Sequence, residues 1–366
     1  MARIEMKNIS HAYRAGPVSA ADYALKPMNL TWEDGGAYAL LGPSGCGKTT
    51  LLNIVSGLLR PRTGQMLFDG KDVTAASPQH RNIAQVFQFP VIYDTMTVFD
   101  NLAFPLRNRK VDEARVKRRV AEIADILELA PTLRHRASGL SADVKQKISL
   151  GRGLVRSDVA AVLFDEPLTV IDPHLKWLLR RKLKQIHQQL KLTLIYVTHD
   201  QTEALTFADR VLVMSEGSIV QNGTPAQLFE SPVHTFVGYF IGSPGMNFLP
   251  CAPREGGLEV AGTLLQLDGA TGARLAAATG ALKLGIRPEF VELAEAHAPG
   301  TIPGVIELVQ DTGTHRLVSA RIGTHLLRAK VADTVAVAPG PAGFRVVGPN
   351  TCYYAGEVMI TRGGGA

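Results

Sequence analysis

The chain has little of what marks secreted, membrane-spanning or metal-stapled proteins. Its 366 residues include three cysteines, Cys46, Cys251 and Cys352, which lie far apart and form no C-x-x-C pair. This spacing argues against a disulfide framework and against a zinc site, so a reducing compartment fits best. No run of about 18 apolar residues exists, and the opening Met-Ala-Arg-Ile-Glu-Met-Lys has no apolar stretch of the kind found in signal peptides. We therefore expect neither a membrane span nor a secretory route.

The excess of positive charge is modest and lacks the pattern of a nucleic-acid interface. The net charge is +6, and aromatic residues make up 6% of the chain. The basic residues between Arg107 and Arg119 and between Lys176 and Lys184 follow amphipathic helical patterns without interleaved aromatics. Such patterns are typical of a solvated helix face. Nucleic acid is therefore not expected as a partner.

A phosphate-binding loop is the strongest motif. Residues 42–50 read Gly-Pro-Ser-Gly-Cys-Gly-Lys-Thr-Thr, of the form G-x-x-x-x-G-K-[ST], between apolar runs at 37–41 and 51–55. A buried strand, a glycine turn and a helix start let backbone N–H groups close on phosphate oxygens; the alternative is a plain strand-to-helix turn. We expect this loop to bind a nucleoside triphosphate through Gly42, Ser44, Gly45, Cys46, Gly47, Lys48, Thr49 and Thr50.

Three side chains of this loop have more specific expected roles. Lys48 is predicted to bridge the β and γ phosphates, and the Thr49 hydroxyl is predicted to hold Mg²⁺. Cys46 lies inside the loop, close to the N-terminus of the helix that follows. A helix N-terminus is expected to lower the pKa of such a thiol.

Two further strand ends carry acids and a histidine. Asp165 and Glu166 close the apolar run that begins at Val162, and His199 follows the run at 194–197. Cleavage of a triphosphate needs a magnesium ligand and a group that orients or deprotonates water. Asp165 is predicted to hold Mg²⁺ through water, Glu166 to accept the water's proton and His199 to bond the γ phosphate. The alternatives are acids that merely close a strand and a structural histidine.

The residue pattern of the chain changes near Gly242. Up to about Leu228, short apolar strands such as 162–164 and 194–197 alternate with amphipathic helices such as 116–129 and 175–190. After Gly242, short Val- and Leu-rich runs punctuated by Gly and Pro predict a small β-barrel or sandwich. We predict an α/β P-loop nucleotide-binding domain over 1–235, with a helical subdomain near 90–155, and a β-rich, OB-like domain over 236–366. The segment 231–250 is the expected connector.

The order of the motifs resembles the ATP-binding subunit of an ABC transporter. It comprises the Walker A loop, then Gln88 in Gln85-Val-Phe-Gln-Phe-Pro, Asp165-Glu166-Pro167, Asp172 and His199. The resemblance implies that the last four are the Q-loop, Walker B, D-loop and switch histidine. It also implies that Tyr13 stacks on adenine, that Gln88 serves both the metal and catalysis, and that Asp172 and Ser141 contact nucleotide.

The second half resembles the carbohydrate-import subfamily, whose ATPases carry an extra barrel domain. The resemblance rests on Pro244-Gly-Met-Asn247-Phe and Gly285-Ile-Arg-Pro-Glu289, while 89–96 and 168–177 are most similar to the ATPases of bacterial glycerol importers. It implies ATP and Mg²⁺ as cofactors and uptake of glycerol or a related polyol or sugar. It also implies two membrane permease subunits, an external solute-binding protein, and a peripheral position on the cytoplasmic face of the inner membrane.

One family motif is altered. The signature Leu-Ser-Gly-Gly-Gln stands here as Leu140-Ser141-Ala142-Asp143-Val144. In ABC dimers each ATP lies between the Walker loop of one subunit and the signature of the other. A carboxylate ~5 Å from the γ phosphate would be repelled by roughly 3 kcal/mol at an effective dielectric near 20, which corresponds to about a hundredfold in affinity.

We therefore expect an asymmetric pair with a second, non-identical ATPase subunit. Four alternatives remain open. Asp143 turns outward; the chain is a catalytically weak regulatory subunit; it is a homodimeric sugar or glycerol-3-phosphate importer ATPase; or it is an ABC ATPase that acts on ribosomes or DNA.

Overall fold

The computed structural model describes residues 2–14, 16, 19–169 and 171–363. Two compact units divide the chain, Met1–Pro225 and Ala226–Ala366, so the division falls earlier than the predicted boundary at 235. The expected connector at 231–250 carries α9 (Thr235–Phe240) and the start of β11 (Asn247–Arg254), and lies within the second unit. Within the described ranges, no helix is long and apolar enough to cross a membrane.

A six-stranded sheet forms the centre of the first unit, in the order β10-β9-β3-β8-β7-β6. Its strands are β3 (Ala37–Leu41), β6 (Ala84–Val86), β7 (Val162–Asp165), β8 (Leu194–Thr198), β9 (Arg210–Ser215) and β10 (Ser218–Gly223). The strands predicted at 162–164 and 194–197 are confirmed. In the parallel register Leu41 lies opposite Thr198, and Asp165 lies opposite Val197. Strands β3, β7 and β8 therefore end at one edge, where open α/β sheets bind ligands.

A second, antiparallel sheet covers the first helix. Its order is β2-β1-β4-β5, with strands β1 (Ile4–His11), β2 (Leu25–Trp32), β4 (Thr63–Phe68) and β5 (Lys71–Asp72). One apolar core combines both sheets with α1 (Lys48–Ser56), as shown by the buried Met6, Leu40 and Leu51. The helix that follows the phosphate loop is therefore held rigidly from both sides.

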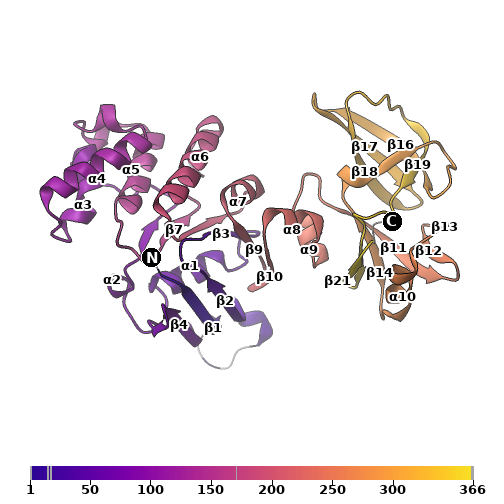
Figure 1. The fold of residues 1–366 in the computed structure, drawn as a ribbon, viewed down its shortest axis with the longest axis horizontal. Helices are drawn as coiled ribbons and strands as arrows, with labels where there is room; N and C mark the ends of the chain where they lie inside the picture. The colour runs from indigo at the N-terminus through magenta and orange to yellow at the C-terminus, as the bar shows by residue number, and fades with distance from the viewer. Residues whose placement is uncertain (1, 15, 17–18, 170, 364–366) are drawn as a thin grey trace. The chain divides into compact units, whose positions relative to one another are not determined.

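The remaining helices of the first unit are mostly amphipathic. They are α2 (Pro78–Arg81), α3 (Val98–Arg107), α4 (Glu113–Ile126), α5 (Ala142–Leu154), α6 (Pro173–Leu190) and α7 (Gln201–Phe207), with short 3₁₀ segments η1 (Ala20–Asp22), η2 (Ala130–Thr132) and η3 (Ala137–Gly139). Helices α3, α4 and α5 form a helical group beside the sheets (Figure 1). The helix predicted at 116–129 is confirmed as α4, but it begins earlier, at Glu113, and ends earlier, at Ile126. The earlier start follows from Asp112, whose carboxylate accepts hydrogen bonds from the N–H groups of Ala114 and Arg115.

The second unit contains two antiparallel sheets around one core, as the predicted β-rich domain requires. The sheet orders are β13-β12-β11-β14-β20-β21 and β15-β19-β16-β17-β18. Besides β11 these strands are β12 (Gly257–Val260), β13 (Thr263–Leu265), β14 (Leu282–Ile286), β15 (Glu292–Ala294), β16 (Ile302–Asp311), β17 (His315–Ile322), β18 (His325–Ala332), β19 (Gly340–Arg345), β20 (Cys352–Ala355) and β21 (Val358–Arg362). Three helices, α8 (Pro225–Glu230), α9 and α10 (Gly269–Ala277), and the 3₁₀ segment η4 (Pro288–Phe290) accompany them.

One buried amide joins the two sheets of this unit. The Asn247 side chain donates to the carbonyls of Ile286 on β14 and Arg328 on β18, at 3.1 and 2.9 Å. Its oxygen accepts from the Arg328 N–H at 2.8 Å. Because each polar atom of the amide is satisfied, it fixes how the sheets meet without an unpaired buried group.

Candidate active site

The phosphate loop runs from the end of β3 to the start of α1, and two of its glycines, Gly42 and Gly47, are sterically required. A Cβ at Gly42 would lie 2.4 Å from the Met214 carbonyl oxygen, and one at Gly47 would lie 2.5 Å from the Ala24 carbonyl oxygen. Gly47 also has φ +104°, a conformation that other residues rarely adopt. No side chain caps α1 at this position, so the N–H groups of its first turn face the loop opening and can bind an anion.

Lys48 is held inside the loop. Its side chain is buried, and Nζ donates hydrogen bonds to the carbonyl oxygens of Gly42 and Pro43 at 2.8 and 2.9 Å. Thr49, the next residue of α1, is exposed at the helix start, as are Ser44 and Gly45 in the loop. The ammonium and the hydroxyl assigned to phosphate and magnesium thus lie at one helix terminus.

Tyr13 is tied to the same helix. Its ring is 68% exposed, and its hydroxyl lies 3.0 Å from the Oγ1 atom of the buried Thr50. The ring meets His11 edge-on, with centroids 4.8 Å apart. An exposed aromatic ring fixed at the first turn of α1 offers a face for stacking, so Tyr13 remains our prediction for the adenine contact.

The prediction for the Cys46 thiol was wrong in direction. The thiol is buried in the core beneath the loop, with Sγ 4.0 Å from Lys48 Nζ. Burial raises the pKa of Cys46 more than the Lys48 charge lowers it. The sequence placed Cys46 in the loop before a helix but could not show that its side chain is part of the core.

Glu166 and His199 meet at the sheet edge where β7 and β8 end. His199 Nδ1 lies 3.1 Å from Glu166 Oε1. Glu166 has φ +46°, unusual for a residue with a side chain. Its N–H donates to the Val197 carbonyl at 2.9 Å, which holds the turn after β7 against β8.

Asp165 occupies the last position of β7, next to Glu166. Burial raises the pKa of the Asp165 carboxyl, and the neighbouring Glu166 charge raises it further, while Lys48 lowers it. A cation at this edge would relieve both unfavourable effects. The predicted magnesium ligands Asp165 and Thr49 are hard oxygen donors, as Mg²⁺ prefers.

The segment around His199 depends on a buried acid that sequence reasoning missed. Glu203 on α7 accepts hydrogen bonds from the Tyr196 hydroxyl at 3.0 Å and from Thr198 Oγ1 at 2.8 Å. The Asp200 carboxylate accepts from the Glu203 N–H and caps α7. The residues on both sides of His199 are therefore fixed. The available signal was Asp200 followed three residues later by Glu203, the spacing of an N-cap residue and an acid in the first turn of a helix.

The Q-loop is connected to the other motifs by a second missed residue. Gln146 on α5 is fully buried, and its Nε2 donates to the Phe87 carbonyl at 3.3 Å and to the Pro167 carbonyl at 2.7 Å. It therefore links the residue before Gln88, the residue after Glu166 and the helix of the altered signature. Gln88 itself lies two residues beyond β6 and is half-buried.

The altered signature begins α5. Ser141 is the N-cap residue and is exposed, and its hydroxyl donates to the Asp143 carboxylate in a short hydrogen bond. Asp143 therefore engages the signature hydroxyl, which the sequence retained. Asp172, the predicted D-loop residue, directly precedes α6 and accepts the Lys176 N–H at 2.9 Å through its carbonyl.

A phosphate loop and an acid–histidine pair on one edge of a parallel sheet define a P-loop nucleotide-binding protein, and comparison with known proteins narrows the class. Residues 25–169 match the ABC transporter family, and residues 242–291 match the MalK OB fold domain. The chain therefore belongs to the ABC transporter ATP-binding proteins. Its activity is that of the family, namely ATP hydrolysis coupled to transport.

Individual relatives agree with this assignment. The sn-glycerol-3-phosphate import ATP-binding protein UgpC of Escherichia coli O1:K1 / APEC is 41% identical over 313 residues, 84% of this chain and 86% of that protein. The UgpC protein of Salmonella typhi is 39% identical over 321 residues, 86% of this chain and 88% of that protein. The solved structure of CbiO1 from Clostridium perfringens, part of the ABC transporter complex CbiONQ, has a TM-score of 0.57 and 26% identity over 62% of this chain and 90% of that one.

Proposed function

We propose that this chain drives uptake of glycerol, or of a related polyol, sugar or polyol phosphate, by hydrolysing Mg-ATP. It would act on the cytoplasmic face of the inner membrane, bound to two permease subunits that receive solute from an external binding protein. The observation that carries the hydrolytic role is the 3.1 Å contact between Glu166 and His199 beside Asp165. The solute class is supported by relatives that are named for import of sn-glycerol-3-phosphate.

The proposed reaction is attack of water on the γ phosphorus. Glu166 accepts the proton as the water oxygen bonds to phosphorus, and the bond from that phosphorus to the β–γ bridging oxygen breaks to release ADP and phosphate. His199 donates a hydrogen bond to the γ phosphate, and Lys48 releases the loop carbonyls to bridge the β and γ oxygens. Asp165, Thr49 and Gln88 would hold Mg²⁺, which neutralises phosphate charge when bound.

We also propose that the partner ATPase is a different polypeptide. In this family the signature serine and the first turn of its helix face the nucleotide of the other subunit. Here the Ser141 hydroxyl is already bonded to Asp143, and the Asp143 carboxylate would face a phosphate of like charge. A partner subunit with a complete signature would complete the ATP site that contains this chain's own Walker residues. The second ATP site, formed by the partner's Walker residues and this chain's altered signature with Asp143, would bind ATP weakly.

Reconstitution tests the function. We expect the chain alone to hydrolyse ATP slowly and to gain activity when co-purified with its permeases and second ATPase in proteoliposomes. External solute and its binding protein should stimulate the rate further. The cargo is identified by comparing this stimulation for glycerol, glycerol 3-phosphate and a disaccharide, each added with the matching binding protein. Rapid turnover as a homodimer would refute the asymmetric pair, and recovery of ribosomes instead of permeases would refute the transport role.

The segment 89–96 is the proposed permease contact. Phe89 is 67% exposed and Val91 is also exposed, whereas Tyr93 packs against Phe104 with centroids 4.8 Å apart and lies under the Arg152 guanidinium. An exposed aromatic anchor is the kind of residue that dominates an interface. Phe89 is therefore the better probe, because Tyr93 also supports the helical group.

Replacing Phe89 by glutamate is expected to lower solute uptake by about tenfold or more, because it places a charge in an apolar contact. Nucleotide binding to the purified chain should not change, since the Phe89 side chain is 67% exposed and has no group that binds phosphate or Mg²⁺. Trp177→Glu is the matched control, because Trp177 is a 52% exposed aromatic outside this segment. Uptake that is equal in the two variants would remove Phe89 from the permease interface.

A further inference from the structure

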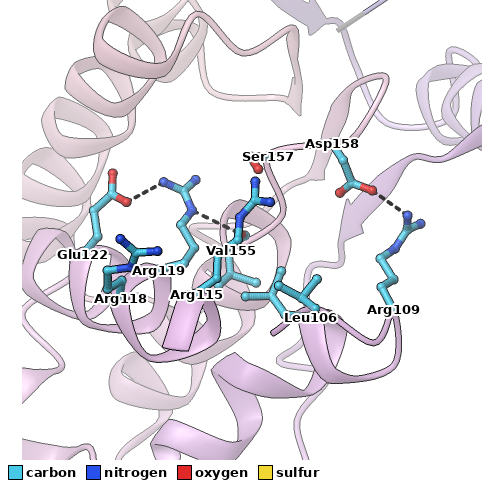
Figure 2. Close-up of a pocket in the computed structure, with 10 residues that line it drawn as sticks. Leu106, Arg109, Arg115, Arg118, Arg119, Glu122, Val155, Ser157 and Asp158 are labelled. Atoms are coloured by element: carbon cyan, nitrogen blue, oxygen red, sulfur yellow. Dashed lines mark hydrogen bonds and ion pairs between the residues drawn. The ribbon is translucent and has the colours of Figure 1, made fainter. Parts of the chain in front are cut away.

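A basic pocket lies among α3, α4 and the segment that follows α5, and it shares no residue with the nucleotide site described above. Its volume is about 500 Å³, within the range of small-molecule sites. The pocket is lined by Leu106, Arg109, Val111, Arg115, Arg118, Arg119, Glu122, Val155, Ser157 and Asp158 (Figure 2). Four arginines thus face two carboxylates.

Both carboxylates are already paired. Asp158 accepts from Arg109 at 2.6 Å, and Glu122 accepts from Arg119 at 2.8 Å. Arg119 is further committed to the structure, since it donates to the carbonyls of Leu154 and Val155 at 2.9 and 3.0 Å. These carbonyls end α5, where a positive charge also offsets the helix dipole.

Arg115 and Arg118 remain available. Within the described part of the chain, neither guanidinium makes a hydrogen bond or an ion pair, and both side chains are exposed. Together with Arg119 and Glu122 they occupy one face of α4 at positions i, i+3, i+4 and i+7. Figure 2 shows these side chains rising from the same stretch of helix. The pocket therefore has two uncompensated positive charges.

The rest of the lining favours a ligand with both an anionic and a neutral part. Leu106 and Val155 are buried and form an apolar floor together with Val111, while Ser157 adds an exposed hydroxyl at the rim. Guanidinium groups match phosphate oxygens with paired N–H donors. An acidic protein surface, whose charged side chains stay hydrated, would leave the apolar floor without a contact.

We propose that this pocket binds the phosphate group of a small molecule, through Arg115, Arg118 and the Ser157 hydroxyl, with the neutral part of the ligand on Leu106, Val111 and Val155. Occupancy would join α4 to the segment after α5. The site is separate from ATP hydrolysis, and it does not depend on which solute is transported.

Calorimetry on the full chain tests this site. A Lys48→Ala background without Mg²⁺ weakens phosphate binding by the loop, and the probes are glycerol 3-phosphate, inorganic phosphate and uncharged glycerol. We expect glycerol 3-phosphate to bind and glycerol not to bind. The Arg115→Gln/Arg118→Gln pair should weaken binding by at least about tenfold, because two charge-assisted contacts are lost.

The matched control is Lys117→Gln/Arg134→Gln, which removes the same charge from two exposed residues outside the pocket, one on α4 and one between η2 and η3. It should leave the affinity unchanged, and thermal unfolding checks that all variants fold. Equal affinity for inorganic phosphate would support the site and assign it to the free anion. Absence of binding, equal loss in both double variants, or tighter binding of a glutamate-rich peptide than of either phosphate would overturn the proposal.

Discussion

Replacing Glu166 by glutamine is expected to lower ATP hydrolysis by the assembled transporter by about a hundredfold to ten-thousandfold, the range for loss of a general base. Glutamine keeps the size of the side chain but cannot accept the proton that the attacking water loses. Steady-state release of phosphate measures the effect, and calorimetry should show that Mg-ATP still binds.

The matched control is Glu216→Gln. Glu216 also has φ +46°, so the same substitution is made at the same backbone conformation. Its side chain is 87% exposed, and its Oε2 atom lies 3.9 Å from Lys26 Nζ. An exposed ion pair of this length contributes little to stability. We expect this control to keep full activity. Unaltered hydrolysis in Glu166→Gln would favour the alternative of a catalytically silent subunit.

Replacing Asp143 by glycine is expected to strengthen ATP binding at the site that faces the altered signature. The change removes a carboxylate and frees the Ser141 hydroxyl. Relief of a repulsion of roughly 3 kcal/mol corresponds to a gain of about a hundredfold in affinity. Titration of the assembled pair with a fluorescent ATP analogue measures both sites, and only the weaker one should change.

Asp143→Asn separates the two effects of this residue. Asparagine removes the charge but can still accept the hydrogen bond from Ser141, so it should recover the electrostatic part of the gain alone. If neither variant changes the affinity, the carboxylate turns away from the nucleotide in the dimer. The asymmetric pair would then lose its physical basis.

The motif-bearing parts of the chain were predictable because local chemistry dictates them. The loop glycines, Lys48, the strand before Asp165 and the strand before His199 each leave a pattern over a few residues. The start of α4 was missed by three residues, since a polar first turn has no apolar periodicity and only Asp112 marks it. The roles of the site residues stay predictions.

Contacts between distant segments left no such pattern. Gln146 lies 59 residues from Phe87, and nothing in the sequence marks it as the link between the Q-loop and the residue after Glu166. The same holds for Glu203, whose partners become neighbours only when α7 folds back on β8. Buried polar groups of this kind are specified by the space that surrounds them.

The sequence alone determined that this chain binds a triphosphate on a P-loop sheet and carries a β-rich second domain, because strand, turn and helix patterns act over short distances. Only the tertiary structure decided that His199 contacts Glu166 and that the Cys46 thiol is buried with a raised pKa. It also decided that Arg115 and Arg118 line a pocket without a carboxylate of their own. Direction, burial and pairing of side chains follow from packing between segments, which no local pattern encodes.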